Sequence, residues 1–221
     1  MVKRKVAEPA RDTDTEQRIL EAAKAVFVLR GTAGARMQEI AEEAGVNQAL
    51  LHYYFRSKDR LADAVFRETA GRMFPAILGI LGGDLPIEKK IDALVATYLD
   101  TMSRTPFLPG YILSELHHHP ERMSQLLGNV VANTTGGDLS NFVRPVFEKL
   151  DRQLADEARA GRMKQISSPQ FVVNLLSLCI FPFAARPMLR AVLGFDDEMF
   201  AQFIDQRRRE LPQYIRNAMR P

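Results

Sequence analysis

The sequence predicts an all-α fold of about nine or ten helices. Apolar residues recur at three- and four-residue steps through most of the 221 residues, which is the spacing of one helix face. No run of alternating β-branched residues stands between hairpin turns, so no strand is expected. Glycines and prolines separate the periodic segments, as is typical where helices end.

The expected helices follow one another between short breaks. The first runs from about Thr15 to Gly31, and two short helices flank Ala44, Gly45 and Val46. A longer helix begins at Ser57 and continues to about residue 81, and Ser168 is expected to cap a later one. The remaining helices are expected at about 87–102, 111–119, 121–133, 142–161, 168–194 and from 196 or 197 onward.

Composition excludes several classes of protein. The chain is 46% hydrophobic and 26% charged, which is typical of a globular domain. One cysteine, Cys179, excludes an internal disulfide framework and a cysteine-rich metal site. The longest charge-free apolar stretch, 171–185, is shorter than the roughly 18 residues that span a bilayer. Because no apolar signal core is present either, we expect a cytoplasmic protein that uses no membrane.

The net charge of +3 and the pI of about 9.1 permit an acidic partner without requiring one. Part of the excess lies in the first eleven residues, where Lys3, Arg4, Lys5 and Arg11 oppose Glu8. We interpret this segment as a basic arm that is either solvated or in contact with DNA.

The most specific pattern is the stretch from Arg36 to Leu61, RMQEIAEEAGVNQALLHYYFRSKDRL. Two short helices that cross near a right angle need a residue of positive φ in the turn, which Gly45 supplies. A small side chain, Ala41, permits close contact, and Ile40, Val46 and Leu51 are suited to the buried seam. This pattern predicts a helix-turn-helix, whose second helix enters the major groove of DNA.

The candidate DNA contacts lie on both short helices and at the start of the helix that follows them. Asn and Gln side chains bond adenine edges, and small apolar groups touch thymine methyls. Tyr and His bind phosphate oxygens, and an ammonium at a helix start favours a phosphate. Whether Tyr53 or Tyr54 faces DNA stays open at this point. The predicted contacts are Arg36, Met37, Gln38, Asn47, Gln48, Ala49, Leu50, His52, Tyr53, Tyr54 and Lys58.

At these residues the chain resembles the tetracycline-repressor (TetR) family of bacterial transcription regulators, whose motif is roughly T-x-x-x-I-A-x-x-A-G-V-S-x-G-x-L-Y-x-H-F-x-S-K-E-x-L. The matching positions are Ile40, Ala41, Ala44, Gly45, Val46, Leu51, Phe55, Ser57, Lys58 and Leu61. The departures are Arg36 for Thr, Asn47 for Ser, Ala49 for Gly, His52 for Tyr and Tyr54 for His. Asn47 is expected to cap the second short helix as the serine would. The resemblance implies a homodimeric repressor that a small molecule releases from a palindromic operator.

We expect two domains. Residues 1–60 would form the DNA-binding domain with its arm, and residues 61–221 a helical domain for ligand binding and dimerisation. The helix that begins at Ser57 would belong to both and transmit movement between them.

The second domain is expected to supply a subunit interface and an effector cavity. The segment 171–183 is too apolar to face water, so it is expected to pair with 139–160 and with a second copy in a four-helix contact. An effector that is apolar or aromatic and has one polar group is expected between the middle helices. The predicted lining residues are Phe66, Met73, Phe74, Tyr98, Met102, Phe107, Tyr111, Glu115 and His118.

Metal, cofactor and enzyme functions are not expected. His117, His118 and His119 are consecutive, so on a helix they point about 100° apart and do not converge on one ion. No Gly-x-Ser-x-Gly turn is present. Two alternatives to the repressor stay open: a DNA-binding activator or architectural protein without a ligand, and a helical enzyme in which the helix-turn-helix is structural.

Overall fold

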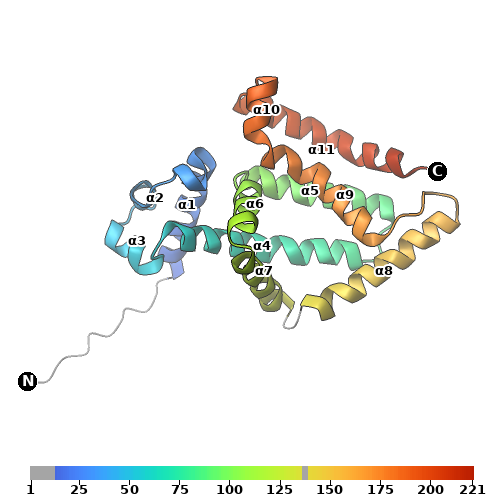
Figure 1. The fold of residues 1–221 in the computed structure, drawn as a ribbon, viewed down its shortest axis with the longest axis horizontal. Coiled ribbons are helices and arrows are strands. Elements are labelled where there is room, and N and C mark those ends of the chain that lie inside the picture. The colour runs from blue at the N-terminus through green and yellow to red at the C-terminus, as the bar shows by residue number, and fades with distance from the viewer. Residues whose placement is uncertain (1–12, 136–138) are drawn as a thin grey trace, which may run out of the picture. The chain divides into compact units, whose positions relative to one another are not determined.

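The computed structural model describes residues 13–135 and 139–221, and the basic arm lies outside these residues. The described residues form eleven α-helices and no strand, which confirms the all-α prediction with one helix more than the upper expectation (Figure 1). The chain divides into two compact units, one ending at Phe66 and the other beginning at Arg67.

The first unit contains α1 (Thr13–Gly34), α2 (Met37–Glu43), α3 (Gln48–Tyr54) and the start of α4 (Lys58–Gly82). Helix α1 is kinked at Gly31, whose φ of 67° is non-helical, where the sequence predicted the helix to end. Helix α1 packs on α2, and α2 packs on α3. The fully buried side chains in this unit include Ile19, Phe27, Ile40 and Leu51.

The second unit contains the rest of α4 and seven further helices. These are α5 (Ile87–Arg104), α6 (Leu108–His118), α7 (Pro120–Thr135), α8 (Leu139–Arg159), α9 (Ser168–Ala184), α10 (Arg186–Leu193) and α11 (Asp197–Met219). Helix α5 packs against both α9 and α11 and is central to this unit (Figure 1).

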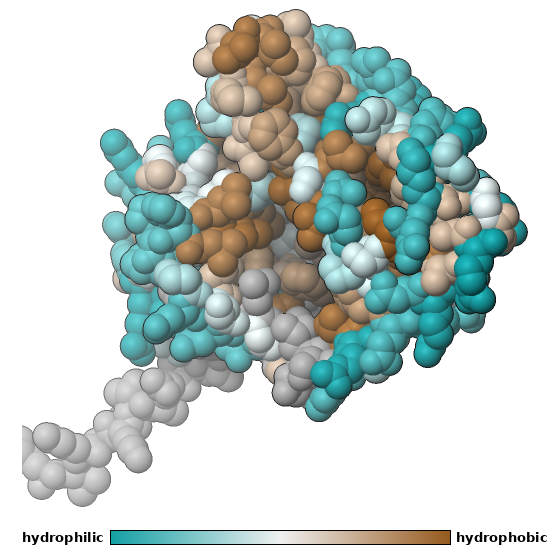
Figure 2. Space-filling model, turned by 45° about the vertical axis from the view of Figure 1, so that its right-hand side comes forward, coloured by the Kyte–Doolittle hydropathy of each residue, from teal (hydrophilic) through white to brown (hydrophobic). Residues whose placement is uncertain are grey.

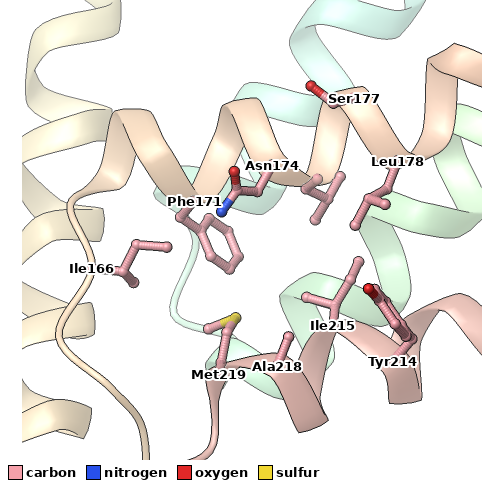
Figure 3. A pocket seen from close by; sticks show the side chains of 10 residues that line it. Ile166, Phe171, Asn174, Ser177, Leu178, Tyr214, Ile215, Ala218 and Met219 are labelled. Carbon is pink, nitrogen blue, oxygen red and sulfur yellow. The ribbon is translucent and has the colours of Figure 1, made fainter.

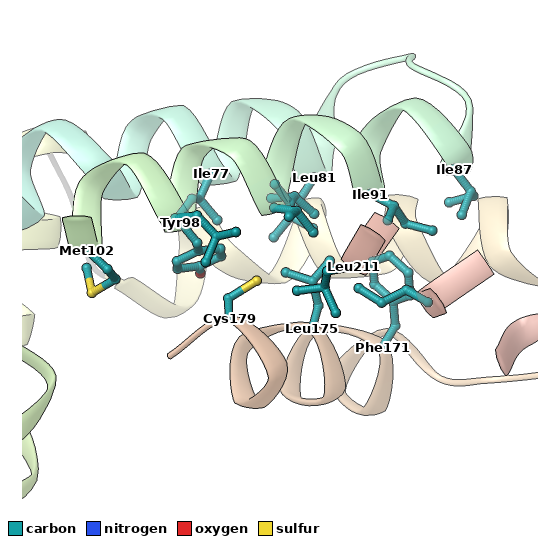
Figure 4. Packing of buried hydrophobic residues seen from close by; sticks show 14 of the residues in the cluster. Ile77, Leu81, Ile87, Ile91, Tyr98, Met102, Phe171, Leu175, Cys179 and Leu211 are labelled. Atoms are coloured by element: carbon teal, nitrogen blue, oxygen red, sulfur yellow. The ribbon is translucent and has the colours of Figure 1, made fainter. Parts of the chain in front are cut away.

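One hydrophobic cluster joins the helices of the second unit (Figure 4). Ile91 and Tyr98 of α5 contribute to it, together with Leu175 of α9 and Leu211 of α11. Cys179 is fully buried in the cluster, and this burial raises the pKa of its thiol to about 12. Cys179 is therefore a small hydrophobic residue of the interior.

The C-terminal end of α4 is fixed by a buried lysine. Lys90 of α5 is fully buried, and its ammonium donates a hydrogen bond of 2.5 Å to the Leu81 carbonyl. Burial lowers the pKa of Lys90. On the adjacent turn, Lys149 of α8 donates to the Asp84 carboxylate at 2.6 Å. These bonds satisfy a carbonyl at the helix end and tie the α4–α5 turn to its neighbours.

The expectation of one helix from Ser168 to Gly194 was wrong. Helix α9 ends at Ala184, and α10 follows at a bend of 65°. Pro182 has no amide hydrogen for the Leu178 carbonyl one turn earlier. Arg207 of α11 donates two hydrogen bonds to that carbonyl, at 3.0 and 2.7 Å, which holds the interrupted helix in place.

The predicted cap of α9 was displaced by one residue. Ser167 is the N-cap, and its hydroxyl accepts a bond from the Gln170 amide at 3.5 Å. Ser168 is instead buried in the first turn, where its amide donates to the Asp151 carboxylate at 2.6 Å.

Within the described part of the chain, no single helix has both the length and the apolar character to cross a membrane. Helices α9 and α10 pass that test by length and composition only as a bent pair.

Candidate nucleic-acid interface

The turn between α2 and α3 has the geometry that the sequence predicts. Gly45 follows the C-cap of α2 with a φ of 63°. Its amide donates to the Glu42 carbonyl at 3.1 Å, and the Val46 amide donates to the Ala41 carbonyl at 3.0 Å. These two bonds form a Schellman motif, which ends α2 and turns the chain into α3.

Replacing Gly45 with alanine is expected to destabilise the first unit by about 1 kcal/mol, because an L-residue strains at positive φ. A side chain at this position has open space, so steric overlap does not contribute. Gly45→Asn should lower the free energy of unfolding by less, because asparagine tolerates this conformation. Gly71 provides the control, because it lies inside α4 and an added side chain there also has open space; Gly71→Ala should not destabilise the protein. Urea unfolding checks the series, and equal losses for Gly45→Ala and Gly45→Asn would contradict it.

Helix α3 begins with the predicted cap. The Oδ1 of Asn47 accepts a hydrogen bond from the Leu50 amide at 2.8 Å. Below this cap, Ile40, Ala41 and Leu51 are buried in the seam between α2 and α3, while Val46 is only half-buried. The cap and the seam together fix the N-terminal end of α3 and the direction in which its outer face points.

The outer face of α3 carries the predicted base-reading groups. Gln48, Ala49 and His52 are exposed, and Leu50 is 36% exposed. Tyr53 is exposed and Tyr54 is half-buried, with the two rings 5.4 Å apart in an edge-to-face contact. Tyr53 is therefore the tyrosine with the larger surface available to a partner.

The predicted contacts at α2 differ in the exposure and the hydrogen bonds of their side chains. Arg36 is exposed, and its backbone amide donates to the Glu39 carboxylate at 3.1 Å. Gln38 donates to Glu42 along the helix surface at 2.9 Å, and Met37 is half-buried. Of these three residues, Arg36 has the cationic group that binds phosphate most strongly.

Lys58 has a structural role that its sequence position did not reveal. Its ammonium donates to the carbonyls of Ala33 and Ala35, at 2.8 and 3.2 Å, and so joins the start of α4 to the α1–α2 connection. Ser57 caps the same helix by accepting a bond from the Arg60 amide at 3.2 Å. An ammonium has three hydrogens, so one is left for a phosphate.

The predicted effector residues are distributed over both units. Phe66 is the last residue of the first unit, and the others belong to the second. Tyr98 and Met102 lie in the hydrophobic cluster, with Met73 packed against it. Tyr111 is buried, whereas Phe74, Phe107 and Glu115 are half-buried. His118 is exposed, and its Nδ1 lies 2.8 Å from the Ser114 carbonyl.

A groove of about 330 Å³ lies between α9 and α11, where the sequence analysis placed no pocket (Figure 3). Phe171 and Asn174 line it from α9, and Tyr214 and Met219 line it from α11. Its polar groups are few, and the Asn174 oxygen already accepts a bond from Gln170 at 2.7 Å. The groove forms because two helices that are distant in sequence diverge. The spacing of apolar residues within one helix cannot predict this.

The described residues contain no group of three or more His, Cys, Asp or Glu side chains placed to hold a metal ion. His117, His118 and His119 are exposed where α6 ends.

Residues 19–65 match the family model described as bacterial regulatory proteins, tetR family. The HTH-type transcriptional regulator TtgW of Pseudomonas putida, itself uncharacterized, is 36% identical over 99 residues, which are 45% of this chain and 69% of TtgW. The HTH-type transcriptional repressor NicS of P. putida is 27% identical, with 89% of each chain covered. The match to SrpR, another P. putida regulator, is 36% identical but covers only 40% of each chain.

Among solved structures, the hemolysin II transcriptional regulator HlyIIR superposes with a TM-score of 0.56. Its sequence is 23% identical, and the match covers 95% of this chain and 98% of HlyIIR. At this identity the likeness concerns the fold alone.

Proposed function

The chain belongs to the TetR family of bacterial transcription regulators, and we propose that it is a homodimeric repressor that leaves a palindromic operator when a small apolar or aromatic effector binds. The observation that carries the proposal is the capped helix α3, which presents Gln48, Ala49 and Leu50 on one exposed turn. Those groups have the chemistry to read base edges and thymine methyls in a major groove.

The groups around α3 are suited to holding the phosphate backbone. Arg36 at the start of α2, Tyr53 on α3 and the remaining hydrogen of Lys58 would bind phosphates on either side of the groove. Such contacts fix the position of α3 on the duplex, while Gln48 and Leu50 supply the sequence preference. The Asn47 Oδ1 already accepts the capping bond from the Leu50 amide, and the amide hydrogens of Asn47 would donate to DNA.

A homodimer follows from the way helix-turn-helix proteins use DNA. Two copies related by a two-fold axis present two recognition helices to half-sites one DNA turn, or a multiple of it, apart. Helix α9 supports this proposal because its outer side is also apolar, with Val173 and Phe181 more than half exposed. The inner side of the same helix is used within the protomer, where Phe171 and Leu175 belong to the hydrophobic cluster.

The effector would bind in the second unit and act through α4, which continues from the DNA-binding unit into it. Figure 2 shows hydrophobic side chains around a hollow in the face turned to the viewer, which supports an apolar ligand. Because Lys90 and Lys149 hold the C-terminal end of α4, a ligand would shift the helix nearer its middle. The ligand must bind one arrangement of α4 better than the other, since equal affinity would change nothing.

Two measurements on the full chain test this function. A mobility-shift titration with the DNA upstream of its own gene should show saturable binding that unrelated DNA does not displace. A thermal-shift screen of small apolar molecules should then find one that raises the melting temperature and weakens DNA binding. If the protein prefers no DNA sequence, the proposal of a transcription regulator is overturned. If it binds DNA but no stabilising molecule weakens that binding, the proposal of an effector is overturned.

A further inference from the structure

A cavity of about 490 Å³ lies where the start of α5, the connection from α8 to α9 and the C-terminal end of α11 meet. Figure 1 shows the end of α11 beside this connection. We name it the arginine pocket, because Arg162, Arg216 and Arg220 line it. Tyr214 and Ala218 of α11 line the groove with α9 instead, so the two cavities open on different sides of α11.

The most deeply buried residues of the arginine pocket are apolar. Ile87, Ile91 and Met163 line it and are 5%, 1% and 7% exposed. All three belong to the hydrophobic cluster of the second unit, so the rest of the fold holds them in place. The volume is within the range of roughly 300–1,000 Å³ that ligand pockets occupy. The pocket therefore has room for a small organic molecule, and apolar side chains for the molecule to cover.

Two of the arginines have hydrogen-bond donors to spare. Arg162 donates to the Glu157 carboxylate at 2.6 and 2.9 Å, and these bonds lower the pKa of Glu157, which keeps the pair charged. A guanidinium has five N–H donors, so three on Arg162 are left. Arg220 is exposed, and within the part of the chain that the structure describes its guanidinium pairs with no other group.

Arg216 is the most firmly held of the three arginines. Its side chain is 24% exposed, and it donates to Asp92 of α5 and to the Gln213 oxygen on its own helix. Asp92 offsets its charge, but two N–H donors remain. The carboxylates that the arginines contact already accept hydrogen bonds, and the other carboxylate of the pocket, Glu88, is exposed to water. The pocket therefore offers more donors than acceptors.

Backbone contacts hold the wall of the pocket in shape. Gly161 ends α8 with a φ of 70°, and the Arg162 amide donates to the Glu157 carbonyl at 3.0 Å, which completes a Schellman motif. Two residues later the Lys164 amide donates to the Met219 carbonyl at 2.7 Å and so joins the connection to the end of α11. Arg162 is therefore positioned before any ligand arrives, which reduces the entropy that binding costs.

We propose that the arginine pocket binds a small organic anion, a carboxylate on an apolar or aromatic body, at a site separate from that of the effector proposed above. The carboxylate would accept charge-assisted hydrogen bonds from Arg162 and Arg220, and its body would cover Ile87 and Met163. Helix α5 starts at this pocket without a side-chain cap, so its first turn also favours a negative charge. The bound anion would join α5, α8 and α11 and stabilise the second unit.

Calorimetric titration of the full chain with hydrocinnamate, a carboxylate on a phenyl-substituted chain, tests the ligand class. Hydrocinnamate should bind with one molecule per chain. Hydrocinnamamide has the same body without the charge, and its dissociation constant should be at least about tenfold higher. Phenylpropylamine and inorganic phosphate should bind more weakly still, since one has the opposite charge and the other no apolar body. Equal affinity for the acid and the amide, tighter binding of the amine, or no binding of hydrocinnamate at millimolar concentration would overturn the proposal.

The double substitution Arg162→Gln and Arg220→Gln tests the location. The Arg162 side chain is 62% exposed and Arg220 is exposed, so the fold should survive, and circular dichroism checks this. The dissociation constant of hydrocinnamate should rise at least about tenfold. Arg159→Gln is the matched control, because Arg159 is 78% exposed at the end of α8 and pairs with Asp156 outside the pocket. It should keep the wild-type affinity within about twofold. A double variant that binds like the wild type would overturn the proposal.

Hydrogen exchange of the wild-type chain gives a second readout without any substitution. Hydrocinnamate should slow the exchange of amides at the start of α5 and in the connection from α8 to α9, while α2 and α3 should not change. Protection confined to the middle of α4 would place the molecule in the effector site. That result would overturn the arginine pocket as a ligand site and leave the proposed repressor intact, because DNA binding is measured separately.

Discussion

Replacing Leu51 with alanine is expected to weaken DNA binding strongly by destabilising the first unit. Leu51 is fully buried between α2 and α3, and removing such a side chain costs about 2–5 kcal/mol. A unit of this size has a total stability of roughly 3–10 kcal/mol, so the loss takes much of it. The second unit has its own hydrophobic cluster, and its unfolding transition should change little.

Leu50 provides the matched control. It is the preceding residue of the same helix, but its side chain is 36% exposed on the outer face. Leu50→Ala should keep the stability of the first unit within about 0.5 kcal/mol, as is usual at the surface, and alter DNA preference where a thymine methyl is contacted. Denaturant unfolding followed by a DNA titration separates the two effects. Equal stability of the two variants would contradict the assigned orientation of α3.

Replacing Lys58 with alanine is expected to weaken binding to every DNA sequence by about tenfold or more, through the loss of one phosphate contact and of an anchor for α4. The two carbonyl bonds of Lys58 position the start of α4, and its remaining hydrogen would face a phosphate. Loss of one phosphate contact should reduce the slope of log affinity against log salt by about 0.9. Fluorescence anisotropy at several salt concentrations measures both quantities.

Lys24→Ala is the control for Lys58, because it removes the same charge from the same unit. The Lys24 ammonium lies 2.7 Å from Glu21 on α1, and the salt slope of this variant should stay that of the wild type. A Lys58→Ala protein with weaker binding but an unchanged slope would show that Lys58 acts only by positioning α4.

The features that the sequence predicted well are those fixed by a few neighbouring residues. Gly45 was expected in the turn because positive φ favours glycine, and Asn47 was expected as a cap because its side chain reaches the amide three residues later. Both follow from local backbone chemistry. The helix-turn-helix could therefore be placed to within a residue or two.

The features that the sequence missed depend on residues far apart in the chain. The break between α9 and α10 involves Pro182 and is held by Arg207, which comes 25 positions later. The anchoring of Lys58 depends on carbonyls 25 and 23 residues before it. Lys90 was not expected in the interior, because its cap on α4 exists only once α4 and α5 have packed. Periodicity and local motifs carry no information on such contacts.

The central claim is that the exposed turn of α3 reads DNA sequence, and selection of binding sites from a random duplex pool tests it most directly. The wild-type chain should enrich one palindromic sequence. Gln48→Ala should enrich a site with the same half-site spacing but relaxed preference at one base pair in each half-site, at a cost of about 1–3 kcal/mol on the original site. Enrichment of no sequence by the wild type, or of the identical sequence by both proteins, would contradict the account.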